Sequence, residues 1–328
     1  MFDNIRGLPA QLRWGIGLDA APLPHDRPVV LLGMGGSAMA ATVATLASTP
    51  RAPIVVHRGY GLPAWAIDSG AAVLAISYSG NTEEVLSGVD EAIGAGLPIV
   101  GVASGGRFEA LATERGIPLV SVPGGLQPRA GVGYQAAAAA AVLGASGHIA
   151  DVDAALGEAA DVLDDLLDGG VGSAVQTGRD IAAALGKRTA VIYGGLGIGA
   201  TAAYRWKTQI NENAKLPAYA GTVPEMNHNE LEGWRPESSD GFGVVYLRDE
   251  YDHPSVAGRL DLMETILNGK VARIGDVRSS GAGPLARFFS LTVVGDVASV
   301  AMAEANGVDP TPVTTLESFK TMLAKGTP

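Results

Sequence analysis

The segment PVVLLGMGGSAMA (28–40) indicates an α/β fold, together with a second segment of the same kind, AAVLAISYSGNTEE (71–84). Each begins with a short apolar run typical of a buried strand, passes through a turn of small residues, and continues with residues that favour a helix. The alternation recurs along the first half, which indicates βαβ units and a mainly parallel sheet buried on both faces. Strands are predicted at 28–33, 52–58, 71–77, 97–104 and 117–123, and helices at 37–48, 81–96 and 108–116.

The pattern restarts in the second half. RTAVIYGGLGIGATAAYRW (188–206) repeats the order of strand, glycine-rich loop and helix, and an amphipathic helix is predicted at 151–167 between the halves. An alanine run at 136–141 opens a small-residue helix suited to close packing. We therefore predict two Rossmann-like, doubly wound α-β-α sandwich domains. Further strands are predicted at 241–250 and 271–277 and a long helix at 287–307; the domains span 1–150 and 187–328, with a single connecting helix at 151–186.

Composition excludes several classes of protein. The 328 residues suit two domains of about 150 residues each. The absence of cysteine excludes disulfides, thiolate zinc sites and a thiol nucleophile. A net charge of −11 without a basic stripe argues against nucleic acids and anionic membranes as partners. No signal peptide is apparent, and no apolar run is expected to supply the roughly 20 residues of a membrane span, so we expect a cytoplasmic protein.

The first motif is GMGGSAMA (33–40). Its glycines leave the strand-to-helix turn without side chains, so backbone N–H groups are exposed there. Ser37 follows at the start of the helix, where the partial positive charge of the helix favours an anion. The residues from Gly33 to Ala38 also half-match a dinucleotide fingerprint, and a plain glycine turn is a further alternative. A nicotinamide enzyme is expected to carry an acid after the second strand, and VVHRGYG (55–61) has none.

The second motif is SYSGNTEE (77–84). Ser77, Ser79 and Thr82 place three hydroxyls within six residues, and Gly80 frees the backbone between them. Such a cluster suits the three oxygens of a phosphate monoester. The alternative is a simple helix cap, for which one hydroxyl suffices.

These motifs carry a resemblance. GGS followed by SxSGNT resembles the signature of sugar-isomerase (SIS) domains. In the second half, NENAK (211–215) and HNELEGW (228–234) are similar to segments of the two-domain bifunctional phosphoglucose/phosphomannose isomerases, and the resemblance covers about residues 15–325. It implies two SIS domains, a hexose 6-phosphate substrate, a homodimer, and no metal or other cofactor.

The resemblance also implies roles for single residues. Glu212 is the base that moves a proton between C1 and C2, and His228 assists ring opening. Arg129 lies beside the enediolate and Lys320 near the ring oxygen. A small hydroxyl residue before that lysine makes room for both C2 epimers, with Thr311, Thr314 and Thr315 as candidates. The phosphate is held by Gly36, Ser37, Ser77, Ser79 and Thr82.

Elementary chemistry agrees with these roles. A single carboxylate can both remove and return the proton, because the proton need not leave it. A fixed cation stabilises the enediolate, and an imidazole titrates in the range that ring opening requires.

Less specific interpretations remain open for each residue. Glu212 could pair with Lys215 on a helix surface. His228 could be a structural loop residue, and Arg129 and Lys320 solvated charges. His228, Glu230 and Glu232 could also bind a metal, as in zinc-dependent mannose-phosphate isomerases of another fold.

Two other functions use the same phosphate site. A non-catalytic sugar-phosphate sensor would not need Glu212 or His228. An aminosugar-phosphate isomerase would use a lysine Schiff base. The second glycine-rich loop, GGLGIGA (194–200), lacks a Ser/Thr cluster, so we expect the second half to supply catalytic residues rather than a second phosphate site.

Overall fold

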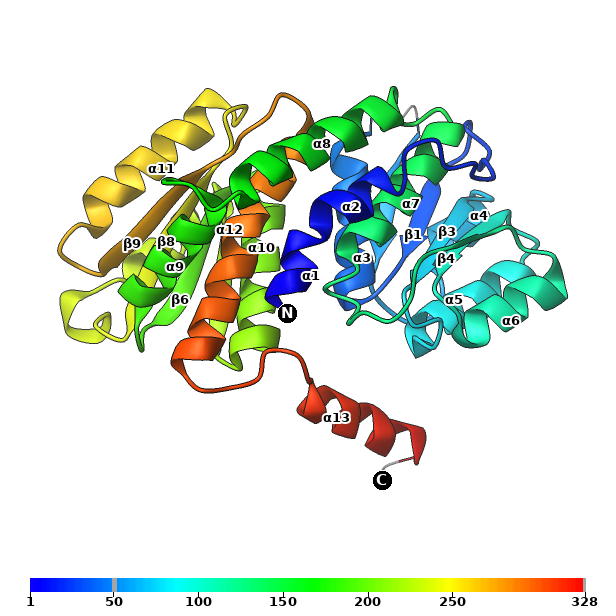
Figure 1. Cartoon of the computed structure of the whole chain (residues 1–328). Helices are drawn as coiled ribbons and strands as arrows, with labels where there is room; N and C mark the ends of the chain where they lie inside the picture. Colours follow the sequence, from blue (N-terminus) through cyan, green and yellow to red (C-terminus); the bar gives the residue numbers. More distant parts are fainter. Residues whose placement is uncertain (49–51, 327–328) are drawn as a thin grey trace.

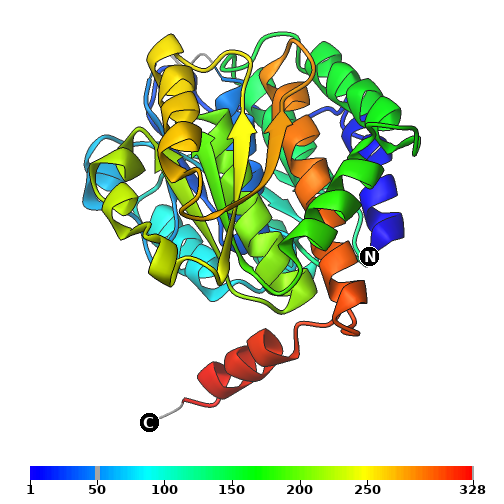
Figure 2. The same cartoon turned by 90° about the vertical axis from the view of Figure 1, so that its left-hand side faces the viewer.

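The computed structural model describes residues 1–48 and 52–326 as two halves, each built on a parallel sheet (Figures 1 and 2). The predicted doubly wound α/β fold is confirmed. The first half contains α1 (Phe2–Arg6), α2 (Leu8–Arg13), β1 (Val29–Leu32), α3 (Gly35–Leu46), β2 (Ile54–His57), α4 (Ala64–Asp68), β3 (Ala72–Ser77), α5 (Glu83–Gly94), β4 (Ile99–Ala103), α6 (Gly106–Arg115), β5 (Leu119–Ser121) and α7 (Val132–Ala145).

The first sheet has the strand order β2-β1-β3-β4-β5. The chain leaves β1 toward β2 on one side and returns to β3 on the other, so the order reverses between β1 and β3. In open parallel sheets, ligands bind at the carboxyl ends of the strands beside such a reversal. The two sequence motifs follow β1 and β3, which places both of them at that point.

Helices cover both faces of this sheet because its central strands are apolar throughout; β1 and β3 are buried at every residue. One face packs on α3 and α7 through residues such as Leu31 and Leu74. The other face packs on α4, α5 and α6 through Val30 and Val73. The alanine run lies in α7, which packs closely against α2 and α3.

The second half repeats the plan with the strand order β7-β6-β8-β9. The sequence analysis did not predict the edge strand β7 or the helix α11. The elements are α8 (Val152–Leu167), α9 (Ala174–Leu185), β6 (Thr189–Gly195), α10 (Ile198–Gln209), η1 (Ile210–Ala214), β7 (Ala218–Val223), η2 (Glu225–His228), η3 (Glu230–Gly233), η4 (Pro236–Ser238), β8 (Phe242–Arg248), α11 (Pro254–Leu267), β9 (Ala272–Arg278), α12 (Pro284–Ala305) and α13 (Thr314–Ala324).

One continuous core joins the halves. It runs from α3 and α7 through α8 to α9, α10 and α12. The segment 151–186 holds two helices, α8 and α9, since glycines at 169, 170 and 172 separate them. In the described part of the chain, α12 alone is long and apolar enough to cross a membrane, contrary to the expectation of no such segment. However, 94% of its most apolar window is buried within the protein, as in a core helix.

The last helix, α13, extends away from the body (Figures 1 and 2). Its described side chains are exposed for most of its length, including Phe319 and Met322. Residues of its first turn line a cavity described below.

Candidate active site

Glu212 lies on a turn of π-helix. The α-helix α10 ends at Gln209, and η1 continues it as five π-helical residues. A π-turn carries one residue more than an α-turn, and such turns are frequent at functional sites. Here Glu212 keeps 28% of its side chain exposed, while the next residue, Asn213, is fully buried.

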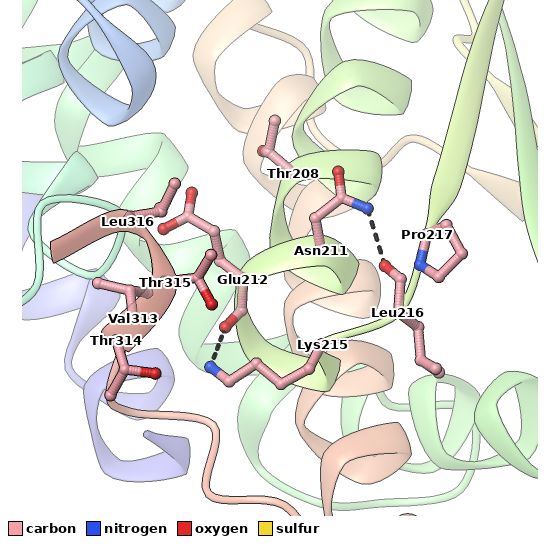
Figure 3. A pocket seen from close by; sticks show the side chains of 10 residues that line it. All are labelled: Thr208, Asn211, Glu212, Lys215, Leu216, Pro217, Val313, Thr314, Thr315 and Leu316. Atoms are coloured by element: carbon pink, nitrogen blue, oxygen red, sulfur yellow. Dashed lines mark hydrogen bonds between the residues drawn. The ribbon is translucent and has the colours of Figure 1, made fainter. Parts of the chain in front are cut away.

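Glu212 faces a cavity of about 510 Å³ (Figure 3). One wall comes from the end of α10 and from η1, and the other from the start of α13. The volume lies within the range of about 300–1,000 Å³ that small-molecule sites occupy. The lining residues are Thr208, Asn211, Glu212, Lys215, Leu216, Pro217, Val313, Thr314, Thr315 and Leu316.

Arg129 lies beside Glu212 and is only 4% exposed; its Nη1 is 3.3 Å from Glu212 Oε2. Its Nε donates to Asn213 Oδ1 at 2.8 Å, and Nη2 donates to the carbonyl oxygens of Pro310 at 2.8 Å and Thr311 at 3.0 Å. Burial lowers the pKa of Arg129, and the Glu212 carboxylate opposes that shift. A guanidinium has five N–H groups. Contacts with the described residues use four of them, which leaves one N–H of Nη1 for a ligand.

Residues 309–313, called the strap from here on, close over this pair. Lys215 holds the strap by donating to the carbonyl oxygen of Pro312 at 2.6 Å and to that of Pro310 at 3.5 Å. The same ammonium donates to the backbone oxygen of Glu212 (Figure 3). Among the described residues, the Glu212 carboxylate pairs with Arg129 rather than with Lys215. Desolvation lowers the pKa of Lys215, and the nearby Arg129 adds to this.

Ser37, at the first phosphate motif, is buried, and its hydroxyl has partners inside the protein. It donates to Gln135 Oε1 at 2.6 Å and accepts the N–H of Tyr78 at 3.2 Å. Ser37 therefore ties the loop after β1 to the loop after β3 and to α7. With this hydroxyl engaged, an anion here would meet mainly the backbone N–H groups at the start of α3, where no side chain caps the helix.

The second motif presents hydroxyls of different exposure. Ser77 is fully buried and donates to Thr82 Oγ1 at 3.0 Å. Thr82 stands at the N-cap of α5 without capping it through its side chain, and Ser79 is exposed. Gly80 has a φ of +65°, and a Cβ there would come 1.8 Å from the carbonyl oxygen of Gly105, so only glycine fits the turn.

The phosphate loops are connected to Arg129. A Cβ on Gly36 would come 2.9 Å from the carbonyl oxygen of Pro128, so the turn after β1 packs on the residue preceding Arg129. Gln135, which accepts from Ser37, donates to the same Pro128 oxygen at 2.9 Å. The loops of the first half and the Arg129–Glu212 pair thus form one connected unit.

Two of the predicted catalytic residues lie outside the cavity that Glu212 faces. His228 is exposed at the end of η2, and Lys320 is exposed on α13; neither lines the cavity of Glu212. Their catalytic roles stay predictions.

The loop that carries His228 is held by the second half itself. Tyr193 donates to Glu230 at 2.9 Å and accepts from Trp234 at 3.1 Å. Burial raises the pKa of Tyr193. Glu230, one member of the suggested metal set, is therefore engaged by Tyr193.

Sequence reasoning missed three parts of the site. It quoted Asn213 and Lys215 within NENAK but gave Asn213 no role, and it did not foresee the strap or the bridging role of Gln135. The signal for Asn213 was a neutral amide beside the proposed base. The strap gave no signal, because its carbonyl groups act through the backbone.

Comparison with known proteins identifies the family of the chain. Residues 174–323 match the family model described as bacterial phospho-glucose isomerase C-terminal SIS domain. The chain is 35% identical to a bifunctional phosphoglucose/phosphomannose isomerase of Caldicellulosiruptor bescii, covering 99% of both chains. It is 36% identical to one of Aquifex aeolicus, covering 99% of this chain and 98% of the relative.

Among solved structures, the C-terminal domain of glucosamine-fructose-6-phosphate aminotransferase from Francisella tularensis has a TM-score of 0.70 at 13% identity, covering 95% of this chain and 97% of that one. This likeness concerns the fold alone. The identities over nearly the whole chain, together with the matched C-terminal SIS domain, show that the chain belongs to the family of bifunctional phosphoglucose/phosphomannose isomerases.

Proposed function

We propose that this chain interconverts glucose 6-phosphate and mannose 6-phosphate with fructose 6-phosphate. The observation that carries the proposal is the Arg129–Glu212 pair, in which a partly exposed carboxylate lies 3.3 Å from a buried guanidinium at a cavity of suitable size. The carboxylate removes the proton from C2 of the open-chain aldose and returns it at C1. The free N–H of Arg129 Nη1 stabilises the negative charge on the enediolate oxygen.

Phosphate binding is assigned to the loops after β1 and β3. Ser79 and Thr82 offer the accessible hydroxyls, and the start of α5 adds backbone N–H groups that no side chain caps. The connection through Gly36 and Pro128 supports a single site in which these loops fix the phosphate and Arg129 lies toward the reacting carbons.

The mechanism is tested by Glu212→Gln. Glutamine keeps the shape and hydrogen bonding of the side chain but removes the basic oxygen. We expect kcat to fall by roughly 10²- to 10⁴-fold while substrate affinity changes little. In deuterated water the wild type should exchange hydrogen at C2 of the aldose phosphate, with part of the original hydrogen retained at C1 of the ketose. Near wild-type turnover of Glu212→Gln would exclude this carboxylate as the base.

Bifunctionality is tested by one coupled assay that starts from fructose 6-phosphate and measures both aldose phosphates. Thr314 and Thr315 line the cavity and Thr311 lies in the strap, so all three candidates for tolerance of both C2 epimers lie near Glu212. Formation of only one aldose phosphate would restrict the proposal to a single activity.

The proposal includes no metal. Glu230 is engaged by Tyr193, which weakens the suggested set of His228, Glu230 and Glu232. Activity should therefore survive exhaustive treatment with EDTA. Loss of activity on chelation, restored by zinc, would revive that set. A sensor function is disfavoured by the Arg129–Glu212 pair, which phosphate recognition does not require. Trapping with borohydride in the presence of substrate would identify a Schiff-base isomerase instead.

The remaining proposals concern assembly and location. We propose a cytoplasmic homodimer, without nucleic acid or membrane partners, in which His228 and Lys320 complete the site. Both side chains are exposed and outside the cavity of a single chain, so they are available to a second copy. Burial of the apolar helix α12 within the core supports a protein that does not use it as a membrane span.

A further inference from the structure

We infer that Asn213 is a positioning residue: its side-chain amide fixes the Arg129 guanidinium so that Nη1 stays beside Glu212. The inference rests on the proposed function, since it concerns the geometry of the proposed catalytic pair. Asn213 does not line the cavity, so it acts through Arg129 rather than on a substrate.

The orientation of the Asn213 amide follows from its partners. Arg129 Nε can only donate, so the atom that faces it at 2.8 Å is Oδ1. Nδ2 then donates to Ser299 Oγ at 2.9 Å. Ser299 passes its own hydrogen to the carbonyl oxygen of Asp296 at 2.7 Å. Because Arg129 Nε can only donate, the amide has a single orientation.

A buried ion pair anchors the same region. Arg205 and Asp296 are 3% and 1% exposed, and their Nη2 and Oδ2 atoms are 2.6 Å apart. Gln209 donates to the other oxygen of Asp296 at 3.0 Å, and Arg205 also reaches the backbone oxygen of Arg129 at 3.4 Å. The backbone and the side chain of Arg129 are thus both held by residues of α10 and η1, and these two elements pack against α12.

Among the contacts of Arg129, the one with Asn213 is the fixed reference. Pro310 and Thr311 belong to the strap, a segment in which Asp309 and Thr311 are exposed. Glu212 has to exchange a proton during the proposed reaction. Asn213 is fully buried, lies outside the strap and has no proton to exchange in the proposed reaction. Without the Asn213 acceptor, the guanidinium can rotate away from its position beside Glu212. A displacement of about 1 Å at a catalytic group can lower the rate by roughly 10²-fold.

The experiment compares variants whose effects on stability and on activity are expected to run in opposite order. Asn213→Asp keeps an acceptor for Arg129 Nε but places a charge in the core. Asn213→Leu keeps the number and branching of the side-chain heavy atoms and removes the acceptor. The new carboxylate has no cation of its own, because Arg129 already pairs with Glu212, and an uncompensated buried charge is more costly than the unpaired N–H that leucine leaves on Arg129. Asn213→Asp should therefore melt at the lower temperature and yet retain the higher kcat.

We expect kcat to fall roughly 10- to 100-fold in Asn213→Leu, with a KM within about threefold of the wild type, because the phosphate loops are untouched. Asn213→Asp should lie between this variant and the wild type. The matched control is Thr292→Val, which removes an equally buried hydroxyl from α12 that donates only to the backbone of Phe289. It should lose some stability and no more than about twofold of kcat.

If kcat instead follows the melting temperature, with Asn213→Leu the more active variant, Asn213 is a structural residue and the inference fails. Glu212→Gln is measured in parallel and reports on the proposed function separately. An inactive Glu212→Gln beside an Asn213 series ordered by stability overturns only the inference. An active Glu212→Gln overturns the proposed base, whatever the Asn213 series gives.

Discussion

Asp252 lies so close to Gly195 that a Cβ on this glycine would come 2.4 Å from the carboxylate oxygen Oδ1. Gly195 ends β6, and Asp252 lies in the loop between β8 and α11. The corresponding loops of the first half follow β1 and β3 and carry the proposed phosphate site. In the second half, the corresponding place therefore holds a carboxylate of the protein itself. This charge would repel a phosphate, in agreement with the missing Ser/Thr cluster.

Replacement of Asp252 should stabilise the protein near neutral pH. Burial raises the pKa of Asp252 above its ordinary value of 3.8. The folded state then binds the proton more tightly than the unfolded state, so ionisation of Asp252 opposes folding, and this effect disappears as the pH falls through the raised pKa. Asp252→Asn should raise the melting temperature at pH 7, and the gain should vanish near pH 4.

Calorimetry at both pH values measures this difference. Asp249→Asn is the matched control in the same loop. Asp249 pairs with Arg287 at 2.9 Å, so its replacement should lower the melting temperature at pH 7. A lower melting temperature of Asp252→Asn at pH 7 would contradict the prediction.

Phosphate recognition should depend on the first half. Ser79→Ala and Thr82→Val each remove one hydroxyl from the proposed phosphate site, and a hydrogen bond to a charged group contributes about 1.5–3 kcal/mol. KM for the hexose phosphate should therefore rise roughly 10- to 100-fold in each variant, while glucose without phosphate should be a very poor substrate. Steady-state kinetics measures both effects.

The control for these two variants is Ser87→Ala. It removes a hydroxyl on α5 that accepts a hydrogen bond from the backbone N–H of Gly61. Its KM should stay close to that of the wild type. Unchanged KM values in both Ser79→Ala and Thr82→Val would place the phosphate site elsewhere.

Lys215 should hold the strap closed. Lys215→Ala removes the donor to Pro310 and Pro312, so amide hydrogen exchange should accelerate in the strap and the first turn of α13. Lys215 has a φ of +58°, a region that glycine adopts more readily than alanine. Lys215→Gly should therefore also lose the strap contacts but melt at a higher temperature than Lys215→Ala. The free energy of unfolding should be larger in the glycine variant by about 1 kcal/mol.

Equal exchange rates in the wild type and Lys215→Ala would mean that Arg129 alone retains the strap. Both variants should also show a lower kcat/KM, since the strap and α13 form one wall of the cavity.

The sequence predicted the parts of the fold that repeat a local rule. The central strands β1, β3, β6 and β8 are apolar runs, and glycine or hydroxyl turns follow the first three of them. Their order in the chain implies parallel pairing. The edge strand β7 was missed, because Tyr219 and Ala220 are exposed in it and no apolar run results. The helix α11 was missed for a related reason, since few of its side chains are buried.

The candidate site was predictable only where a residue type carries its own chemistry. Glu212 and Arg129 lie far apart in the sequence, and the resemblance rather than any local pattern joined them; the structure places them in contact. The π-turn that turns Asn213 inward and Glu212 outward depends on packing against α12. No local signal in the sequence announces such a turn.

The last prediction concerns which chain supplies His228 to the site. In a single chain His228 is exposed and outside the cavity of Glu212, so we expect it to act in the site of a second copy. Glu212→Gln and His228→Ala should each be impaired as homodimers. When the two variants are co-expressed, the mixed dimer contains one site with an intact glutamate from one chain and an intact histidine from the other. Activity should then reappear in the mixed dimer, purified with two different tags. If His228 acts within its own chain, each site of that dimer carries one substitution, and the mixture should be no more active than the average of its parents.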